Sequence, residues 1–110
     1  MTDDLTFAAL RTANNLRQKQ WEAGATFTIE YLGCALAGEV GEACNVIKKL
    51  ARERLGAVGS RANLDQLAEE LADAVIYIDL IARKANIDLA DSVRAKFNLT
   101  SEKYDLGARL

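Results

Sequence analysis

The stretch Leu67-Ala-Glu-Glu-Leu-Ala-Asp-Ala-Val-Ile-Tyr-Ile78 decides the fold class, together with Ala35-Leu-Ala-Gly-Glu-Val-Gly-Glu-Ala-Cys-Asn-Val-Ile47. Both stretches are strongly apolar, and the whole chain lacks proline, which favours long uninterrupted helices. Each stretch also carries two acids three residues apart, Glu39 with Glu42 and Glu70 with Asp73. Residues at this spacing share one face of an α-helix, so each helix is expected to aim two carboxylates at one place.

Outward from these stretches, the sequence predicts an all-α fold of four helices, in a single domain that spans residues 1–110. Asp3, Asp4 or Thr6 offers an N-cap for the first helix, and Asn63 offers one for the third. Gly56 and Gly59 mark the one obvious loop. The expected helices cover residues 6–22, 29–55, 64–86 and 88–103.

The second and third helices carry different apolar patterns. On the second, the expected core stripe is Leu36, Val40, Ala43, Ile47 and Leu50, with the acids beside it. On the third, only Asp73 and Asp79 are charged between residues 71 and 82, so apolar residues surround the helix. A four-helix monomer needs one apolar stripe per helix, so this pattern predicts self-association, as a homodimer or homotetramer. The alternative is a helix central to a monomer.

The composition excludes several classes of site. The chain has no histidine, which removes His-based zinc and iron sites and Ser-His-Asp triads. Its net charge of −2 argues against binding a nucleic-acid polymer through a basic patch. Neither a membrane span nor a signal peptide is expected, and Cys34 and Cys44 are interpreted as small buried hydrophobes. Together these features predict a cytoplasmic protein.

The four acids in their apolar setting predict a metal site. Taking an ionised carboxylate out of water costs several kcal/mol unless something compensates the charge. No Lys or Arg occurs in residues 35–47 or 67–82, so a local counter-ion is missing. An oxygen-only cluster suits magnesium, manganese or calcium. Gly38 and Gly41 predict close approach of a ligand or another helix, because glycine is otherwise unfavourable inside a helix. The alternative is a solvated acidic face.

Two further groups of residues suggest a ligand. The first helix presents Phe7, Leu10, Asn14, Arg17 and Trp21 in one stripe, where the amide and guanidinium are unusual for a core. This stripe is either a pocket wall, with Trp21 stacking on a flat ligand, or a core edge with Arg17 reaching outward. Near the C-terminus, positive and amide groups either neutralise phosphates or form a solvated last turn; they are Arg94, Lys96, Asn98 and Lys103.

The combined pattern resembles the MazG-like family of all-α nucleoside triphosphate pyrophosphohydrolases. The resemblance rests on Gly38-Glu-Val-Gly-Glu-Ala43, on Glu69-Glu-Leu-Ala-Asp-Ala-Val-Ile-Tyr77, and on Lys96-Phe-Asn98 with Lys103. The family signature is an acid pair, a spacer and Glu-x-x-Asp, and 27 residues separate Glu42 from Glu70 here. Many members have a further Glu where this chain has Gly38.

The resemblance implies a bundle completed by oligomerisation and Mg²⁺, with Mn²⁺ as a substitute, bound by Glu39, Glu42, Glu70 and Asp73. It implies a base pocket that uses Trp21, Asn14 and Tyr77, and phosphate binding by Lys96, Asn98 and Lys103. Glu39 or Glu69 is then the expected general base; the alternative is a metal-bound water that needs no separate base. The expected reaction hydrolyses a nucleoside triphosphate, ribo or deoxy, to the monophosphate and pyrophosphate in nucleotide-pool cleaning. The alternatives are a non-catalytic oligomerisation module and a regulatory domain that binds metal or nucleotide.

Overall fold

A computed structural model describes residues 4–110, and over that range the chain forms four α-helices and no strand. They are α1 (Phe7–Glu22), α2 (Ile29–Arg54), α3 (Leu64–Lys84) and α4 (Leu89–Lys103). The all-α prediction and its four ranges are therefore confirmed, with ends that differ by one or two residues. The first predicted cap, Asp3, lies outside the described residues.

Local side-chain capping sets where each helix begins. The hydroxyl of Thr6 accepts a hydrogen bond from the amide of Ala9 at 3.0 Å, and Thr28 caps α2 in the same way. Asn63 and Gln66 exchange side-chain-to-backbone bonds at the start of α3, which is a capping box. Each cap satisfies backbone amides that have no partner inside the helix, so the boundaries follow from local chemistry.

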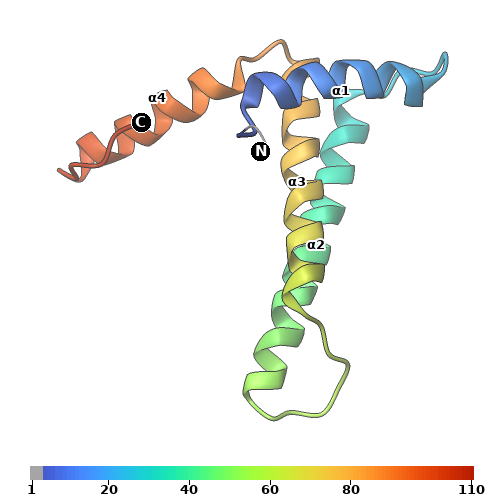
Figure 1. Cartoon of the computed structure of the whole chain (residues 1–110), viewed down its shortest axis with the longest axis vertical. Helices are drawn as coiled ribbons and strands as arrows, with labels where there is room; N and C mark the ends of the chain where they lie inside the picture. The colour runs from blue at the N-terminus through green and yellow to red at the C-terminus, as the bar shows by residue number, and fades with distance from the viewer. Residues whose placement is uncertain (1–3) are drawn as a thin grey trace.

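The helices α2 and α3 form a long hairpin, and α1 lies across one end of it (Figure 1). At the other end, the loop after α2 turns closely over Arg52, whose Nη1 donates to the carbonyl of Ser60 at 3.1 Å. Gly59 has φ +145°, and a Cβ there would lie 2.6 Å from Arg52 Nη1. A glycine is therefore required at this position of the loop.

The contact between α2 and α3 follows alternating spacings of three and four residues on each helix. Such spacing keeps one row of side chains facing the partner helix. The α2 row is Leu32, Leu36, Glu39, Ala43, Val46 and Leu50; the α3 row is Leu67, Glu70, Ala74, Tyr77 and Ile81, and all of these are buried or half-buried. One acid of each pair thus lies inside the apolar contact between the helices.

Two sequence-based expectations about α2 were wrong. Val40 and Ile47, predicted in the core stripe, are 45% and 48% exposed, because the row that contains Glu39 faces α3 instead. Cys34 and Cys44, predicted to be buried, are exposed free thiols because they too lie outside that row. Glu39 and Glu70 therefore lie in the helix contact itself, whereas Glu42 and Asp73 are exposed beside it.

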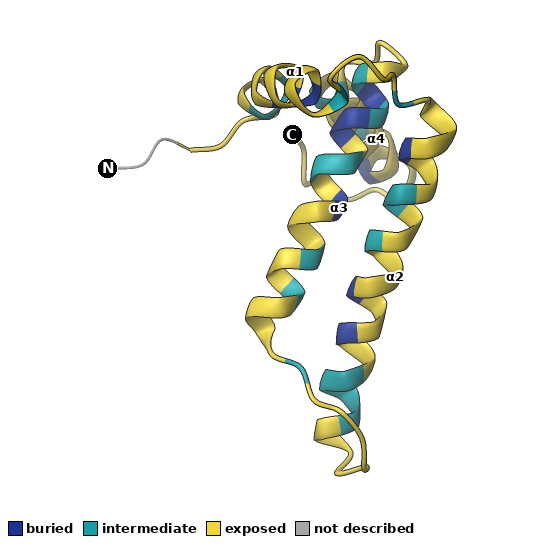
Figure 2. Ribbon diagram, turned by 90° about the vertical axis from the view of Figure 1, so that its right-hand side faces the viewer, coloured by how far each residue is buried: buried dark blue, intermediate teal, exposed yellow. Residues whose placement is uncertain are grey.

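The burial is concentrated where α1 crosses the end of the hairpin (Figure 2). Elsewhere the molecule is extended, with a radius of gyration of 17.3 Å. A compact chain of this length has a radius of gyration of about 13 Å. The accessible surface is 8144 Å², whereas about 6,000 Å² is typical for this mass. The chain by itself thus leaves much of its apolar surface uncovered.

Candidate metal and nucleotide site

The acids of α2 and α3 converge in the middle of the hairpin. Ligand oxygens of Glu39, Glu70 and Asp73 lie within 4.8 Å of one another. Glu39 and Glu70 are half-buried, whereas Asp73 is exposed. Glu42 is not one of these three, but it lies close enough for its charge to act on Glu70. The two helices therefore bring together the acids that their spacing predicted.

Glu70 is the least satisfied member of the cluster. Its Oε2 is buried and has no hydrogen-bond partner among residues 4–110. Burial, followed by the negative charge of Glu42 and the proximity of Glu39, raises the pKa of Glu70 to about 7. A buried oxygen without a donor, among like charges, is the environment that a divalent cation relieves. The donor set, all carboxylate oxygen, fits Mg²⁺ or Mn²⁺.

The raised pKa of Glu70 predicts how the metal-free protein responds to pH. Between pH 4.5 and about 7, folded Glu70 holds a proton that the unfolded chain releases. This contribution to stability is complete below the unfolded pKa, and it is lost as pH rises through the folded pKa. In a chelator, the melting temperature should therefore fall between about pH 4.5 and 7 and level off above that range. Thermal unfolding at several pH values measures this.

The matched control for the pH experiment is Glu70→Gln, which keeps the shape of the side chain without its ionisation. We expect this variant to lose most of the decline in melting temperature across that window. Added Mg²⁺ should also reduce the decline in the native protein, because the cation takes the place of the proton. An equal decline in both proteins would assign the effect to other groups.

Tyr77 and Arg17 lie beside the acids. Burial, then nearby Tyr31, Glu39 and Asp73, raise the pKa of the Tyr77 phenol, and Arg17 opposes the shift. The structure therefore brings Arg17 of α1 toward the acid-bearing face of α3. Tyr31, which the sequence did not single out, stacks on Phe27 with ring centroids 4.6 Å apart. It lies in the first turn of α2 and is exposed, and the sequence marks it only as an aromatic residue upstream of the acids.

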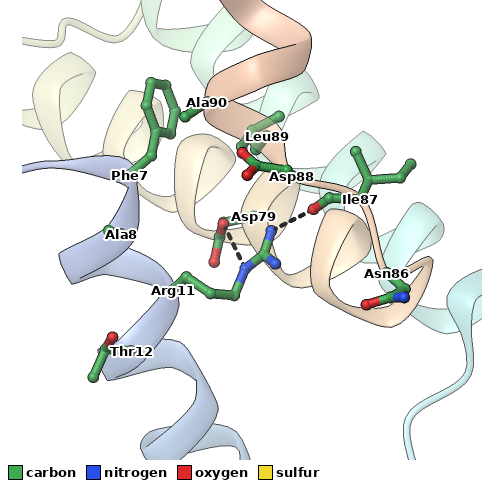
Figure 3. Close-up of a pocket in the computed structure, with 10 residues that line it drawn as sticks. All are labelled: Phe7, Ala8, Arg11, Thr12, Asp79, Asn86, Ile87, Asp88, Leu89 and Ala90. Atoms are coloured by element: carbon green, nitrogen blue, oxygen red, sulfur yellow. Dashed lines mark hydrogen bonds and ion pairs between the residues drawn. The ribbon is translucent and has the colours of Figure 1, made fainter.

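Asn14 has a different role from the one predicted. Only 2% of its surface is exposed, and its Nδ2 donates to Asp79 Oδ2 at 2.9 Å. The Nε of Arg11 donates to the other oxygen of Asp79 at 3.0 Å, and Nη2 of Arg11 donates to the carbonyl of Ile87 (Figure 3). We therefore assign Asn14 to the packing of α1 on α3. Sequence reasoning missed Arg11 and the buried Asp79.

The remaining predicted residues lie apart from the cluster or on its rim. Glu69 is exposed on α3, next to Glu70. Trp21 is 66% exposed in the last turn of α1, and among residues 4–110 its ring has no aromatic partner. Lys96 and Lys103 are exposed on α4, and the Lys103 ammonium lies 5.4 Å from the ring centroid of Tyr104. Asn98 exchanges two hydrogen bonds with the backbone of Leu110, at 2.8 and 3.2 Å.

Comparison with known proteins identifies the family to which this all-α chain with two acid pairs belongs. The model of the MazG nucleotide pyrophosphohydrolase domain matches residues 27–105, which include α2, α3 and α4. The chain belongs to this family. It is also similar to the Gene 37 protein of Mycobacterium phage L5, with 29% identity over 79 residues, which are 72% of this chain and 68% of that protein. Among residues 4–110, no helix is long and apolar enough to cross a membrane.

Proposed function

We propose that the chain is a magnesium-dependent pyrophosphohydrolase that converts nucleoside triphosphates to monophosphates and pyrophosphate. The main support for this proposal is Oε2 of Glu70, which is buried without a hydrogen-bond partner among residues 4–110 and lies inside a cluster of carboxylates. Membership of a nucleotide pyrophosphohydrolase family supports the substrate class. A role in removing unwanted nucleotides, deoxynucleotides included, from the cytoplasmic pool is consistent with that reaction.

In this proposal, Glu39, Glu42, Glu70 and Asp73 hold Mg²⁺, which supplies charge neutralisation for the triphosphate and acidifies the attacking water. Glu69 is exposed beside this group, so it can accept a proton from that water, and Glu39 is the alternative base. Arg17 and Tyr77 flank the acids and are suited to orient the substrate. Gly38 leaves the side of α2 open, with nothing within 4 Å of where its Cβ would be.

A pyrophosphate-release assay over the ribo- and deoxynucleoside triphosphates tests the reaction. We expect release that requires Mg²⁺ or Mn²⁺ and stops in a chelator. An oligomerisation module would bind and hydrolyse none of the nucleotides. A regulatory domain would bind a nucleotide in calorimetry without releasing pyrophosphate. Either result would contradict the proposed activity.

Trp21 is proposed to stack on the base of the nucleotide. A stacked base contributes about 1–3 kcal/mol in single-strand binders, so Trp21→Ala should weaken nucleotide binding about tenfold or more. Because the side chain is 66% exposed, stability and Mg²⁺ affinity should change little. Calorimetric titration with a non-hydrolysable triphosphate measures the affinity. Leu16→Ala, at a similarly exposed apolar position of α1, is the control and should bind normally.

Self-association is proposed through the exposed apolar residues of α3. Val75 is 46% exposed and Ile78 is 40% exposed on this helix, although both are apolar. The excess surface of about 2,000 Å² per chain matches what each subunit of an obligate homodimer buries. The open sides of Gly38 and Gly41 leave room for a helix of a second copy.

Val75→Asp should therefore dissociate the assembly and lower its melting temperature, because the change buries an uncompensated charge at the interface. Light scattering after size exclusion measures the mass. The control is Val58→Asp, in the loop after α2, where the side chain is 98% exposed and a charge should be tolerated. A native chain that is monomeric at micromolar concentration would contradict the proposed assembly.

A further inference from the structure

Positive charge is concentrated at the end of the α2–α3 hairpin that is remote from α1 and α4 (Figure 1). We call residues 48–64 the tip. They include five of the 14 basic residues of the chain but a single acid, Glu53; the five are Lys48, Lys49, Arg52, Arg54 and Arg61. The tip thus has a charge of +4, and the rest of the chain has a charge of −6. With Asp65 and Glu69 of the adjoining α3 counted, this end of the hairpin still has a charge of +2.

The cations of the tip are not neutralised within the chain. Among residues 4–110, the ion pairs join side chains of α1, α3 and α4, and none of them includes a residue of the tip. Arg52 donates to the carbonyl of Ser60 at 3.1 Å, and Arg61 donates to the carbonyl of Ala57 at 2.8 Å. These bonds fix the shape of the loop, but a neutral carbonyl leaves the charge of the guanidinium in place. The tip is therefore a preformed cationic surface.

The tip also exposes aliphatic side chains around its apex, the loop of residues 55–63. Leu55 is 83% exposed, Val58 is 98% exposed and Leu64 is 72% exposed. Such side chains gain free energy when they pass from water into an apolar phase. At 1.5 Å per residue, Lys48 lies about 10 Å from Leu55 along α2, so the cations of α2 lie within about 10 Å of the apex.

The order of these groups along the hairpin matches the layers of an anionic bilayer surface. The polar headgroup region on each side of a bilayer is about 5–8 Å thick, with hydrocarbon beneath it. An aliphatic apex that reaches the edge of the hydrocarbon therefore leaves the cations behind it among the headgroups. Anionic headgroups attract clusters of four or more Lys and Arg residues, and apolar side chains add to the binding.

Two other partners fit the tip less well. A nucleic-acid backbone takes up positive charge but offers no apolar surface to Val58, and the tip has no aromatic residue to stack on a base. A second copy of the chain is proposed to bind at Val75 and Ile78, and Val75 is about 16 Å along α3 from Leu64. The tip lies outside that surface.

We propose that the tip binds the surface of a membrane that contains anionic lipids, with its aliphatic apex at the edge of the hydrocarbon and its cations among the headgroups. The contact is peripheral, since it involves a loop and the adjoining ends of two helices. It goes beyond the proposed function and does not depend on it, because none of the residues of the tip belongs to the acid cluster. Binding should weaken as salt is added, since salt screens exposed charges.

Flotation of the full chain with lipid vesicles tests the charge of the tip. Vesicles of phosphatidylcholine with phosphatidylserine should bind the native protein, and vesicles of phosphatidylcholine alone should not. Lys48→Gln with Arg54→Gln should weaken binding more than tenfold, because each basic residue near an anionic surface contributes about fivefold in affinity. The control, Lys19→Gln with Lys84→Gln, removes the same charge from exposed positions of α1 and α3 and should bind like the native protein. Equal losses in both variants would overturn the proposal.

Val58→Ser tests the apolar part of the contact without a change in charge. Its affinity for the mixed vesicles should fall by up to about tenfold, with the helical content retained by circular dichroism, since the side chain is 98% exposed. Unchanged affinity, or binding of duplex DNA in place of the vesicles, would overturn the proposal. A native protein that binds the mixed vesicles but hydrolyses no nucleotide would contradict the proposed function alone.

Discussion

Asp73→Asn is expected to reduce nucleotide hydrolysis by about a hundredfold or more, in line with the loss of a group that stabilises the transition state electrostatically. The substitution removes one charge from the proposed metal site and leaves the side chain its size. The fold should persist, because Asp73 is exposed. Initial rates at saturating Mg²⁺ measure the loss.

The control for Asp73→Asn is Asp65→Asn, in the first turn of the same helix and exposed to solvent. Its expected effect is at most a small change in helix stability, since an acid near a helix N-terminus contributes about 0.3–1 kcal/mol. Equal activity in Asp73→Asn and Asp65→Asn would remove Asp73 from the site.

Asp79→Ala is expected to have the largest effect on stability. Asp79 is fully buried and accepts hydrogen bonds from Arg11 and Asn14, which fix α1 on α3. Removing one partner of a buried ion pair costs about 3–5 kcal/mol. Here the change leaves the buried amide of Asn14 and the partly buried guanidinium of Arg11, whose side chain is 25% exposed, without their acceptor. Urea unfolding at a fixed protein concentration measures the difference.

Asp91→Ala is the comparison for Asp79→Ala, because Asp91 also pairs with an arginine, Arg94, but at the surface. Exposed ion pairs contribute about 0–1 kcal/mol, so this variant should stay close to the native protein. Similar losses in the two variants would mean that the buried pair stabilises the protein no more than a surface pair.

Local features of the sequence predicted much of the fold. The apolar stretches, the capping residues and the glycine-rich loop predicted four helices within one or two residues of their ends. The three-residue spacing within each pair, Glu39 with Glu42 and Glu70 with Asp73, also predicted that the acids would meet. What the sequence did not specify was which face of α2 meets α3, since Val40 and Ile47 continue an equally good apolar stripe. That choice depends on the partner helix.

The residues of the first helix were harder to assign for a related reason. Asn14 and Arg17 share one stripe, but the structure buries Asn14 against Asp79 and leaves Arg17 beside Tyr77. Recognising Asn14 as a packing residue required knowing that Asp79, 65 residues away, lies opposite it. A polar residue on an apolar face indicates a partner, and the partner can be a ligand or a distant residue of the same chain.

Titration with Mn²⁺, followed by electron paramagnetic resonance, is the most direct test of the metal site. The native protein should bind Mn²⁺ at pH 8, and excess Mg²⁺ should displace it, since both cations suit the same oxygen ligands. Glu70→Gln should lose that binding while keeping its helical content. Equal binding of Mn²⁺ by the native protein and by Glu70→Gln would contradict the assignment of the acid cluster as a metal site.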